Sequence, residues 1–176
     1  MTNRELQADV FGRRTDFEYS ETWVGYALFG LRVVMGWTLF YAGITKVLDP
    51  KWSAEGFLLH AIPEGNPFGG VWATMANEWV WLIDPLNQWG LTLVGLALLA
   101  GAFVRWSAFW GAVMMLFYWA ASYPFENAIL IDDHMVYAFL LFGLGAFGAG
   151  RIFGLDEYLE DTGIVEKNRW LRYVMG

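Results

Sequence analysis

The stretch that decides the fold covers residues 23–48 and has the sequence WVGYALFGLRVVMGWTLFYAGITKVL. Only Arg32 and Lys46 carry a charge within it, and Asp49-Pro50 ends the run. A helix of this length is about 38 Å long, which is enough to cross a bilayer with some tilt. We therefore predict a transmembrane helix over residues 23–48.

Three further apolar runs follow, over residues 86–104, 106–123 and 131–153. Only Arg105 separates the first two of these runs, so they predict a tight helical hairpin. The alternative, one helix over residues 88–122, would be about 50 Å long and would exceed any bilayer core. The sequence therefore predicts an all-α fold, a polytopic membrane four-helix bundle.

The four runs define a transmembrane domain over residues 23–154, between a polar tail at 1–22 and a charged tail at 155–176. The loop over residues 49–85 is not featureless, because a turn cluster at 63–67 separates an apolar segment from a Trp-rich amphipathic one. We predict two short helices here, which either lie on the membrane surface or form a packed cap outside it. A further short amphipathic helix is expected near Trp170.

The distribution of Arg and Lys predicts the orientation. The basic residues of the segments on the N-terminal side are Arg4, Arg13, Arg14, Arg105, Arg151, Lys167, Arg169 and Arg172. The opposite side holds only Lys46 and Lys51. Because basic residues accumulate on the inner side of a membrane, we expect a multi-pass plasma-membrane protein with both termini cytoplasmic and the 49–85 loop outside.

The composition fits a bilayer, since 57% of the residues are hydrophobic, 16% are charged and 19% are aromatic. The net charge of −7 either faces a cationic partner or reflects a salt-adapted, halophile-like acidic surface, and we favour the second interpretation. The expected partners are membrane lipids and either a partner subunit or further copies of the chain in a homo-oligomer, with no nucleic acid.

One face of the first helix is a candidate binding surface. A charged residue inside a membrane span, such as Arg32, is a functional hypothesis by default. Lys46 follows fourteen residues later, within about 40° of the same face, and Gly36 and Gly43 share that face. Small residues let another backbone or a flat ligand approach closely.

Arg32 also has a structural alternative. Its long side chain could extend along apolar surface to a lipid phosphate, to Glu21 or to Asp156. Apart from Asp132 and Asp133 at the start of the last run, the four apolar runs contain no Asp or Glu that could neutralise it. Both interpretations stay open at the level of sequence.

The second candidate cluster is Asp132-Asp133-His134 at the start of the last apolar run. A carboxylate there can simply cap a helix, because free N–H groups favour negative charge. A His beside a carboxylate is also a plausible proton acceptor, and Tyr137 lies on the same helical face. Two residues of the preceding loop are expected near the same site: Glu126 and Asn127.

The sequence argues against several cofactors. It contains no Cys, which excludes disulfides, thiol redox chemistry and Cys-ligated metals within this chain. His60 and His134 are its only histidines, so neither a bis-His haem nor a metal site is expected. No haem, iron–sulfur cluster or metal is therefore predicted, and no P-loop, dinucleotide-binding motif or nucleophile triad is present.

Three stretches together carry a family resemblance. LRVVMGWTLFYAGITK at 31–46 resembles the first helix of the DoxX/DoxD family, LR-x3-G-x3-F-x2-G-x2-K, and keeps every marked residue. GLALLAGAFVR at 95–105 is similar to the family's second helix and its closing Arg. DDHMVYA at 132–138, followed by Gly150-Arg151 and Gly154-Leu155-Asp156, is similar to the fourth helix and exit of DoxD proteins.

This resemblance covers residues 24–156 and implies a membrane four-helix bundle linked to thiosulfate:quinone oxidoreductase or to other membrane redox complexes. The sequence departs from the family in one place, because many DoxX relatives carry a Glu early in the second helix. Here residues 86–104 hold no acid, and only Asn87 or Gln88 is near that position. The long 49–85 loop favours the DoxD type.

We therefore expect a subunit of a quinone-linked redox system, with quinone as its cofactor. Quinone is expected beside the cation face and the last helix, at Arg32, Gly36, Gly43, Lys46 and Tyr137. Proton handling is expected at Asp132, Asp133 and His134. The alternative is a non-catalytic assembly, anchoring or lipid-organising subunit, and a small transporter is disfavoured because the two middle helices are too apolar.

Overall fold

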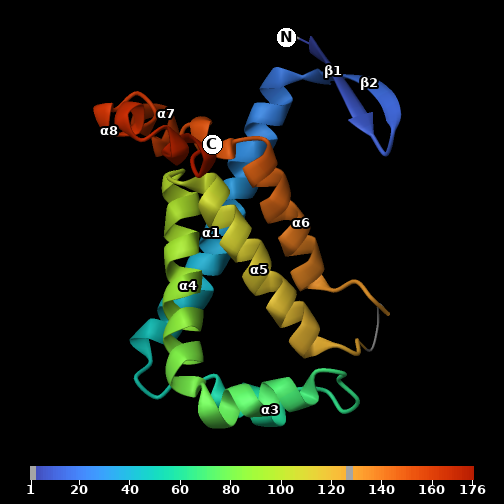
Figure 1. The fold of residues 1–176 in the computed structure, drawn as a ribbon, viewed down its shortest axis with the longest axis vertical. Helices are drawn as coiled ribbons and strands as arrows, with labels where there is room; N and C mark the ends of the chain where they lie inside the picture. Colours follow the sequence, from blue (N-terminus) through green and yellow to red (C-terminus); the bar gives the residue numbers. More distant parts are fainter. Residues whose placement is uncertain (1–2, 126–128) are drawn as a thin grey trace.

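The computed structural model describes residues 3–125 and 129–176, and most of these residues are helical. Four long helices form its body (Figure 1): α1 (Glu21–Leu48), α4 (Val80–Ala100), α5 (Val104–Ser122) and α6 (Asp133–Ala146). The most extensive contacts join α1 to α4 and α5 to α6, whereas α4 and α5 diverge from their shared turn. The mainly helical architecture is therefore confirmed, as two helix pairs joined at one end.

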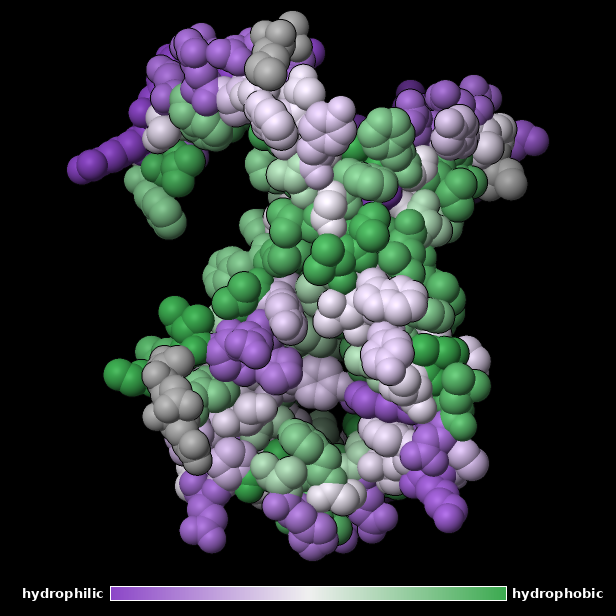
Figure 2. All heavy atoms as spheres, turned by 180° about the vertical axis from the view of Figure 1, so that it is seen from behind, coloured by the Kyte–Doolittle hydropathy of each residue, from purple (hydrophilic) through white to green (hydrophobic). Residues whose placement is uncertain are grey.

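The helices carry the apolar surface expected of a membrane protein. Among the described residues, α1 and α4 are long and apolar enough to cross a bilayer, and α6 is a shorter apolar helix. Large apolar side chains point outward from several helices, including Val34, Leu93 and Phe139. Figure 2 shows hydrophobic residues mainly around the middle of the molecule and hydrophilic residues mainly at its two ends.

Close backbone contact holds α1 against α4. A Cβ on Gly36 would lie 2.9 Å from the backbone nitrogen of Leu99, and a Cβ on Gly43 would lie 2.5 Å from Thr92 Oγ1. The buried residues of α1 are Arg32, Met35, Gly36, Leu39 and Gly43. The predicted shared face is therefore present, and backbone and side chains of α4 cover its two glycines.

The predicted hairpin between the second and third apolar runs is confirmed, but its turn lies earlier than expected. Gly101 (φ 65°) and Phe103 (φ 51°) turn the chain in the left-handed region, and Arg105 lies in the first turn of α5. At its other end α4 begins at Val80, not at residue 86. The helix continues through Pro85, which lacks the N–H that would bond the carbonyl of Trp81.

The predicted last helix, residues 131–153, is too long. It ends at Ala146, because Gly148 (φ 64°) turns the chain out of the helix. The chain then forms η1 (Ala149–Arg151), α7 (Leu155–Leu159), α8 (Gly163–Lys167) and η2 (Arg169–Tyr173). The short helix expected near Trp170 is thus a 3₁₀ turn, and these elements form a layer over one end of the bundle (Figure 1).

The loop between α1 and α4 forms a layer at the opposite end. It contains α2 (Glu55–His60) and α3 (Gly69–Glu78), and α3 crosses the ends of α4 and α5 in Figure 1. Leu58, Trp72 and Ala76 are buried together with Ala121 of α5. Of the two alternatives for this loop, the packing favours the cap.

The N-terminal segment departs from the all-α prediction. Residues expected to form only a polar tail build an antiparallel hairpin of β1 (Asn3–Val10) and β2 (Arg13–Ser20). Apolar and polar residues alternate along both strands, which is the period of a strand with two unlike faces. This hairpin lies beside the start of α1 (Figure 1).

Candidate functional site

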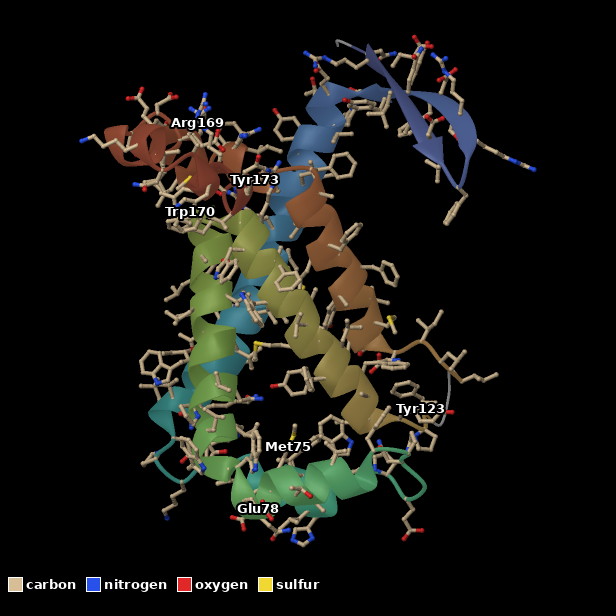
Figure 3. All side chains as sticks on the ribbon, viewed as in Figure 1. Met75, Glu78, Tyr123, Arg169, Trp170 and Tyr173 are labelled. Atoms are coloured by element: carbon tan, nitrogen blue, oxygen red, sulfur yellow. The ribbon has the colours of Figure 1, made fainter. Side chains whose placement is uncertain are left out.

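A cavity of about 720 Å³ lies where α4 and α5 diverge, and its volume is in the range of small-molecule sites. Its wall is almost entirely apolar and includes Leu86, Leu93, Trp110, Met114 and Phe117. Met75 of α3 points between α4 and α5 in Figure 3 and helps to close the cavity on the cap side. The cavity is partly open to the outside.

Asn87 and Tyr118 bring polar groups to the wall of this cavity. Lys46 forms hydrogen bonds to both of them. Lys46 Nζ donates a hydrogen bond to Asn87 Oδ1 at 2.8 Å and to the Tyr118 hydroxyl at 3.4 Å. Asn87 Nδ2 donates to the same hydroxyl at 2.5 Å. The lysine ammonium also lies 5.0 Å from the ring centre of Trp52, an arrangement that stabilises a cation.

This geometry makes Tyr118 a donor toward the cavity. A tyrosine oxygen can accept hydrogen bonds while its own O–H donates one. Because the oxygen already accepts from Lys46 and Asn87, its proton is left for an acceptor in the adjoining cavity. Asn87 and Lys46 each keep at least one further N–H that these two bonds do not use.

The second predicted cluster contacts the ring of Tyr118. The His134 ring stacks on the Tyr118 ring, with 5.4 Å between centroids and an angle of 29°. His134 Nδ1 lies 2.6 Å from Asp132 Oδ2, and Asp132 Oδ1 accepts from the backbone N–H of Met135 at 3.0 Å. Asp132 therefore caps α6, as one alternative predicted, and contacts His134 at the same time.

The structure thus brings Lys46 and His134 to one tyrosine, Lys46 at its hydroxyl and His134 against its ring, through residues of α1, α4, α5 and α6. Asp133 is exposed at the start of α6, and Tyr137 packs against the main hydrophobic core. Two predicted neighbours of the cluster, Glu126 and Asn127, lie outside the described residues. Tyr118 was missed; its hydroxyl near the end of an apolar helix is the only sequence signal that could have indicated it.

Arg32 serves a different part of the molecule. It lies about 21 Å along α1 from Lys46 and is 1% exposed. Its Nη1 donates to the Ala149 carbonyl at 2.5 Å and its Nη2 to the Phe153 carbonyl at 3.2 Å. Arg32 therefore binds the chain where it leaves α6. The two cations on the shared face of α1, Arg32 and Lys46, thus act at opposite ends of the bundle.

Asp156 completes this inner cluster. Its fully buried carboxylate accepts the backbone N–H groups of Phe103 at 2.6 Å, Val104 at 3.0 Å and Gly176 at 3.0 Å. It also attracts Arg32 electrostatically. Of the two carboxylates that sequence offered to Arg32, Asp156 is therefore the nearby one, whereas Glu21 pairs with Arg4.

Gly36 and Gly43 were predicted to admit a ligand, and in the structure this space is taken by α4. The cavity instead lies on the opposite side of α4, against α5. Of the predicted quinone set, Lys46 reaches the cavity wall, through its hydrogen bonds to Asn87 and Tyr118.

Comparison with known proteins agrees with this architecture. The DoxX family model matches residues 27–124, more than half of the chain. The chain belongs to the DoxX family. This membership and the two apolar helices indicate a membrane protein. The DoxX match contains Lys46, Asn87 and Tyr118 but neither the N-terminal hairpin nor His134. No curated protein and no solved structure matches the chain.

Proposed function

We propose that this DoxX-family protein is a membrane subunit of a quinone-linked redox system and that the quinone head group binds at Asn87 and Tyr118. The thiosulfate:quinone oxidoreductase type is the system to which the sequence resemblance points. The observation that carries the proposal is an apolar cavity whose wall includes Asn87 and Tyr118, two hydrogen-bond donors that Lys46 connects. The four long helices would all span the bilayer.

The chemistry of the wall suits a quinone. Quinone carbonyls accept hydrogen bonds, and Tyr118, Asn87 and Lys46 are all donors. The remaining wall is apolar and matches an isoprenoid tail, and the opening lets such a tail extend toward lipid. When bound, a quinone supplies the capacity to take up two electrons and two protons.

In this proposal, Asp132 and His134 handle protons beside Tyr118. Asp132 is fixed by its capping bond to α6, and it orients His134 through Nδ1. The His134 ring stacks on the Tyr118 ring, so this pair lies next to the residue that donates into the cavity. Lys46 and Asn87 keep that hydroxyl oriented, so the chain offers a pre-arranged donor at the cavity wall.

Binding of decylubiquinone to the purified protein, measured by titration calorimetry, tests the proposal. Tyr118→Phe removes one donor and is expected to weaken binding about tenfold, which corresponds to one hydrogen bond of about 1.4 kcal/mol. Tyr41→Phe is the matched control, because Tyr41 lies exposed on α1. Equal affinity of wild type and Tyr118→Phe would reject the assignment.

The apolar lining also favours a second function, since the same cavity can hold a phospholipid acyl chain. The protein would then be a non-catalytic, lipid-organising subunit of a larger membrane complex. Native mass spectrometry of the purified protein separates the two functions. A bound phospholipid that decylubiquinone does not displace would support the second one.

A further inference from the structure

The β1–β2 hairpin has two unlike faces. Its register pairs Leu6 with Phe17 and Arg4 with Tyr19, and because side chains alternate along a strand, these four lie on one face. The same face also carries Ala8, Val10, Thr15 and Arg13. The hairpin's acidic residues lie on the opposite face: Glu5, Asp9, Asp16 and Glu18. The apolar face therefore carries only positive charge.

The turn of this hairpin exposes an aromatic residue in an unfavourable conformation. Phe11 (φ 52°) and Gly12 (φ 75°) both have positive φ, a turn in which Asn, Asp and Gly are the usual residues. Phe11 is 102% exposed. A bulky residue in the left-handed region is costly, and an outlier of this kind indicates a functional constraint.

The position of the hairpin relates it to the membrane surface. Trp23 and Tyr26 follow it on the first turns of α1 and are both exposed, as aromatic residues at a bilayer interface are. The ion pair between Arg4 Nε and Glu21 Oε1, at 2.5 Å, ties the base of the hairpin to α1. In Figure 1 the hairpin bends sideways, and its turn comes down to about the level where α6 ends.

The difference in hydropathy between the two faces also shows in the space-filling view. In Figure 2 the hairpin, at the upper left, has hydrophilic residues along its outer side and hydrophobic residues on its underside. That underside faces toward the apolar middle of the molecule. A two-stranded hairpin is marginally stable alone in water, so an apolar surface that covers this face would stabilise it.

We infer that the β1–β2 hairpin is an interfacial anchor that lays its apolar face, with Phe11 at the tip, on a bilayer surface of anionic phospholipid. Val10, Phe11 and Phe17 enter the head-group region, and Arg13 contacts lipid phosphate. Charge favours an anionic membrane as the partner, because the apolar face has no acidic residue and lipid phosphates complement Arg13, whereas Arg4 already pairs with Glu21. The inference is independent of what occupies the cavity.

Spin labels at single cysteines test this in the full chain, which has no native Cys. Val10→Cys and Phe17→Cys probe the apolar face, and Asp9→Cys and Asp16→Cys are matched controls on the other face. In nanodiscs of phosphatidylglycerol, collision with oxygen relative to a water-soluble nickel complex is expected to be several-fold higher for the first pair. Equal water exposure of both faces would overturn the inference, as would spin–spin broadening from a second copy on the hairpin.

A charge reversal tests the lipid partner. Arg13→Glu, introduced into the labelled Val10→Cys variant, is expected to lower the immersion of the label in phosphatidylglycerol nanodiscs and to have a smaller effect in phosphatidylcholine. Arg14→Glu is the control, because Arg14 lies on the opposite face, across the register from Asp9, and donates a hydrogen bond to Gln7. The same loss in both variants, or the same loss in both lipids, would overturn the role of Arg13.

Discussion

At the residue scale, the two cations of α1 are satisfied in different ways. Arg32 donates to backbone carbonyls of the segment that follows α6, whereas Lys46 donates to side chains of α4 and α5. A guanidinium suits the first task because its rigid fork reaches two acceptors at once. The mobile ammonium of lysine suits the second. The same face of α1 therefore has a structural role at Arg32 and borders the candidate binding site at Lys46.

The structural role predicts a large loss of stability on removing Arg32. Arg32→Ala removes the buried guanidinium that donates to the Ala149 and Phe153 carbonyls, and is expected to lower the free energy of unfolding by about 3 kcal/mol. Reversible unfolding in detergent measures it. Arg151→Ala is the control, since its exposed ion pair with Glu160 contributes roughly 1 kcal/mol or less. Similar losses in both variants would contradict the role of Arg32.

Asp156 is expected to be as sensitive, because it holds N–H groups of three residues. Asp156→Ala removes the acceptor for Phe103 and Val104 at the start of α5, and should cost about 2 kcal/mol or more by the same unfolding measurement. The neighbouring Glu157→Ala is the control, because Glu157 is exposed. An Asp156 variant as stable as the Glu157 variant would show that solvent replaces these bonds.

The sequence predicted much of this residue chemistry but not its connections. It identified Arg32, Lys46 and the Asp132–His134 pair as unusual, because charge and histidine stand out in apolar surroundings. It could not place Tyr118 between Lys46 and His134, since that depends on how α5 crosses α4 and α6. The partners of Arg32 were likewise hidden, because they are backbone groups more than a hundred residues away.

At the element scale, small residues determine which helices approach each other. Gly43 of α1 leaves room for the backbone of α4 at Thr92, and Gly95 of α4 leaves room for the backbone of α1 at Phe40. The α4–α5 pair makes fewer contacts, and the cavity lies between these two helices. Tight packing on one side of α4 and loose packing on the other together position the candidate site.

Matched glycine substitutions separate packing from helix propensity. Gly43→Ala places a methyl group against Thr92 and is expected to destabilise the protein by about 1–3 kcal/mol. Gly30→Ala, on the same helix, meets nothing within 4 Å and should be neutral or stabilising by up to about 1 kcal/mol. Thermal unfolding in detergent compares the two variants, and equal midpoints would show that α1 and α4 can separate without cost.

Element boundaries were harder to predict than the elements themselves. The helix predicted at 23–48 is α1 with two more residues, because Asp49 and Pro50 end it as expected. The other ends moved where backbone conformation overrides hydrophobicity, as at Gly148, whose left-handed conformation ends an apolar run early. The β1–β2 hairpin was missed because its turn is Phe-Gly and not the Asn-Gly or Asp-Gly that signals a hairpin.

At the scale of the whole molecule, the two ends have different architectures. One end carries the β hairpin, the Arg32–Asp156 cluster and the layer of α7, α8 and η2; the other carries the cap of α2 and α3 beside the cavity (Figures 1 and 3). The distribution of Arg and Lys along the chain predicts that the first end faces the cytoplasm. The candidate quinone site would then lie near the outer surface, with His134 on the same side.

This orientation is open to direct measurement, since any introduced cysteine is the only one in the chain. Glu64→Cys lies in the cap loop, Lys167→Cys lies in the layer at the opposite end, and both positions are exposed. In intact cells a membrane-impermeant maleimide is expected to label residue 64 at once and residue 167 only after lysis. Labelling of both positions before lysis would place the two ends on one side and exclude a bundle that spans the membrane. Labelling of residue 167 alone would keep the span and invert it, which would move the cavity and His134 to the cytoplasmic side.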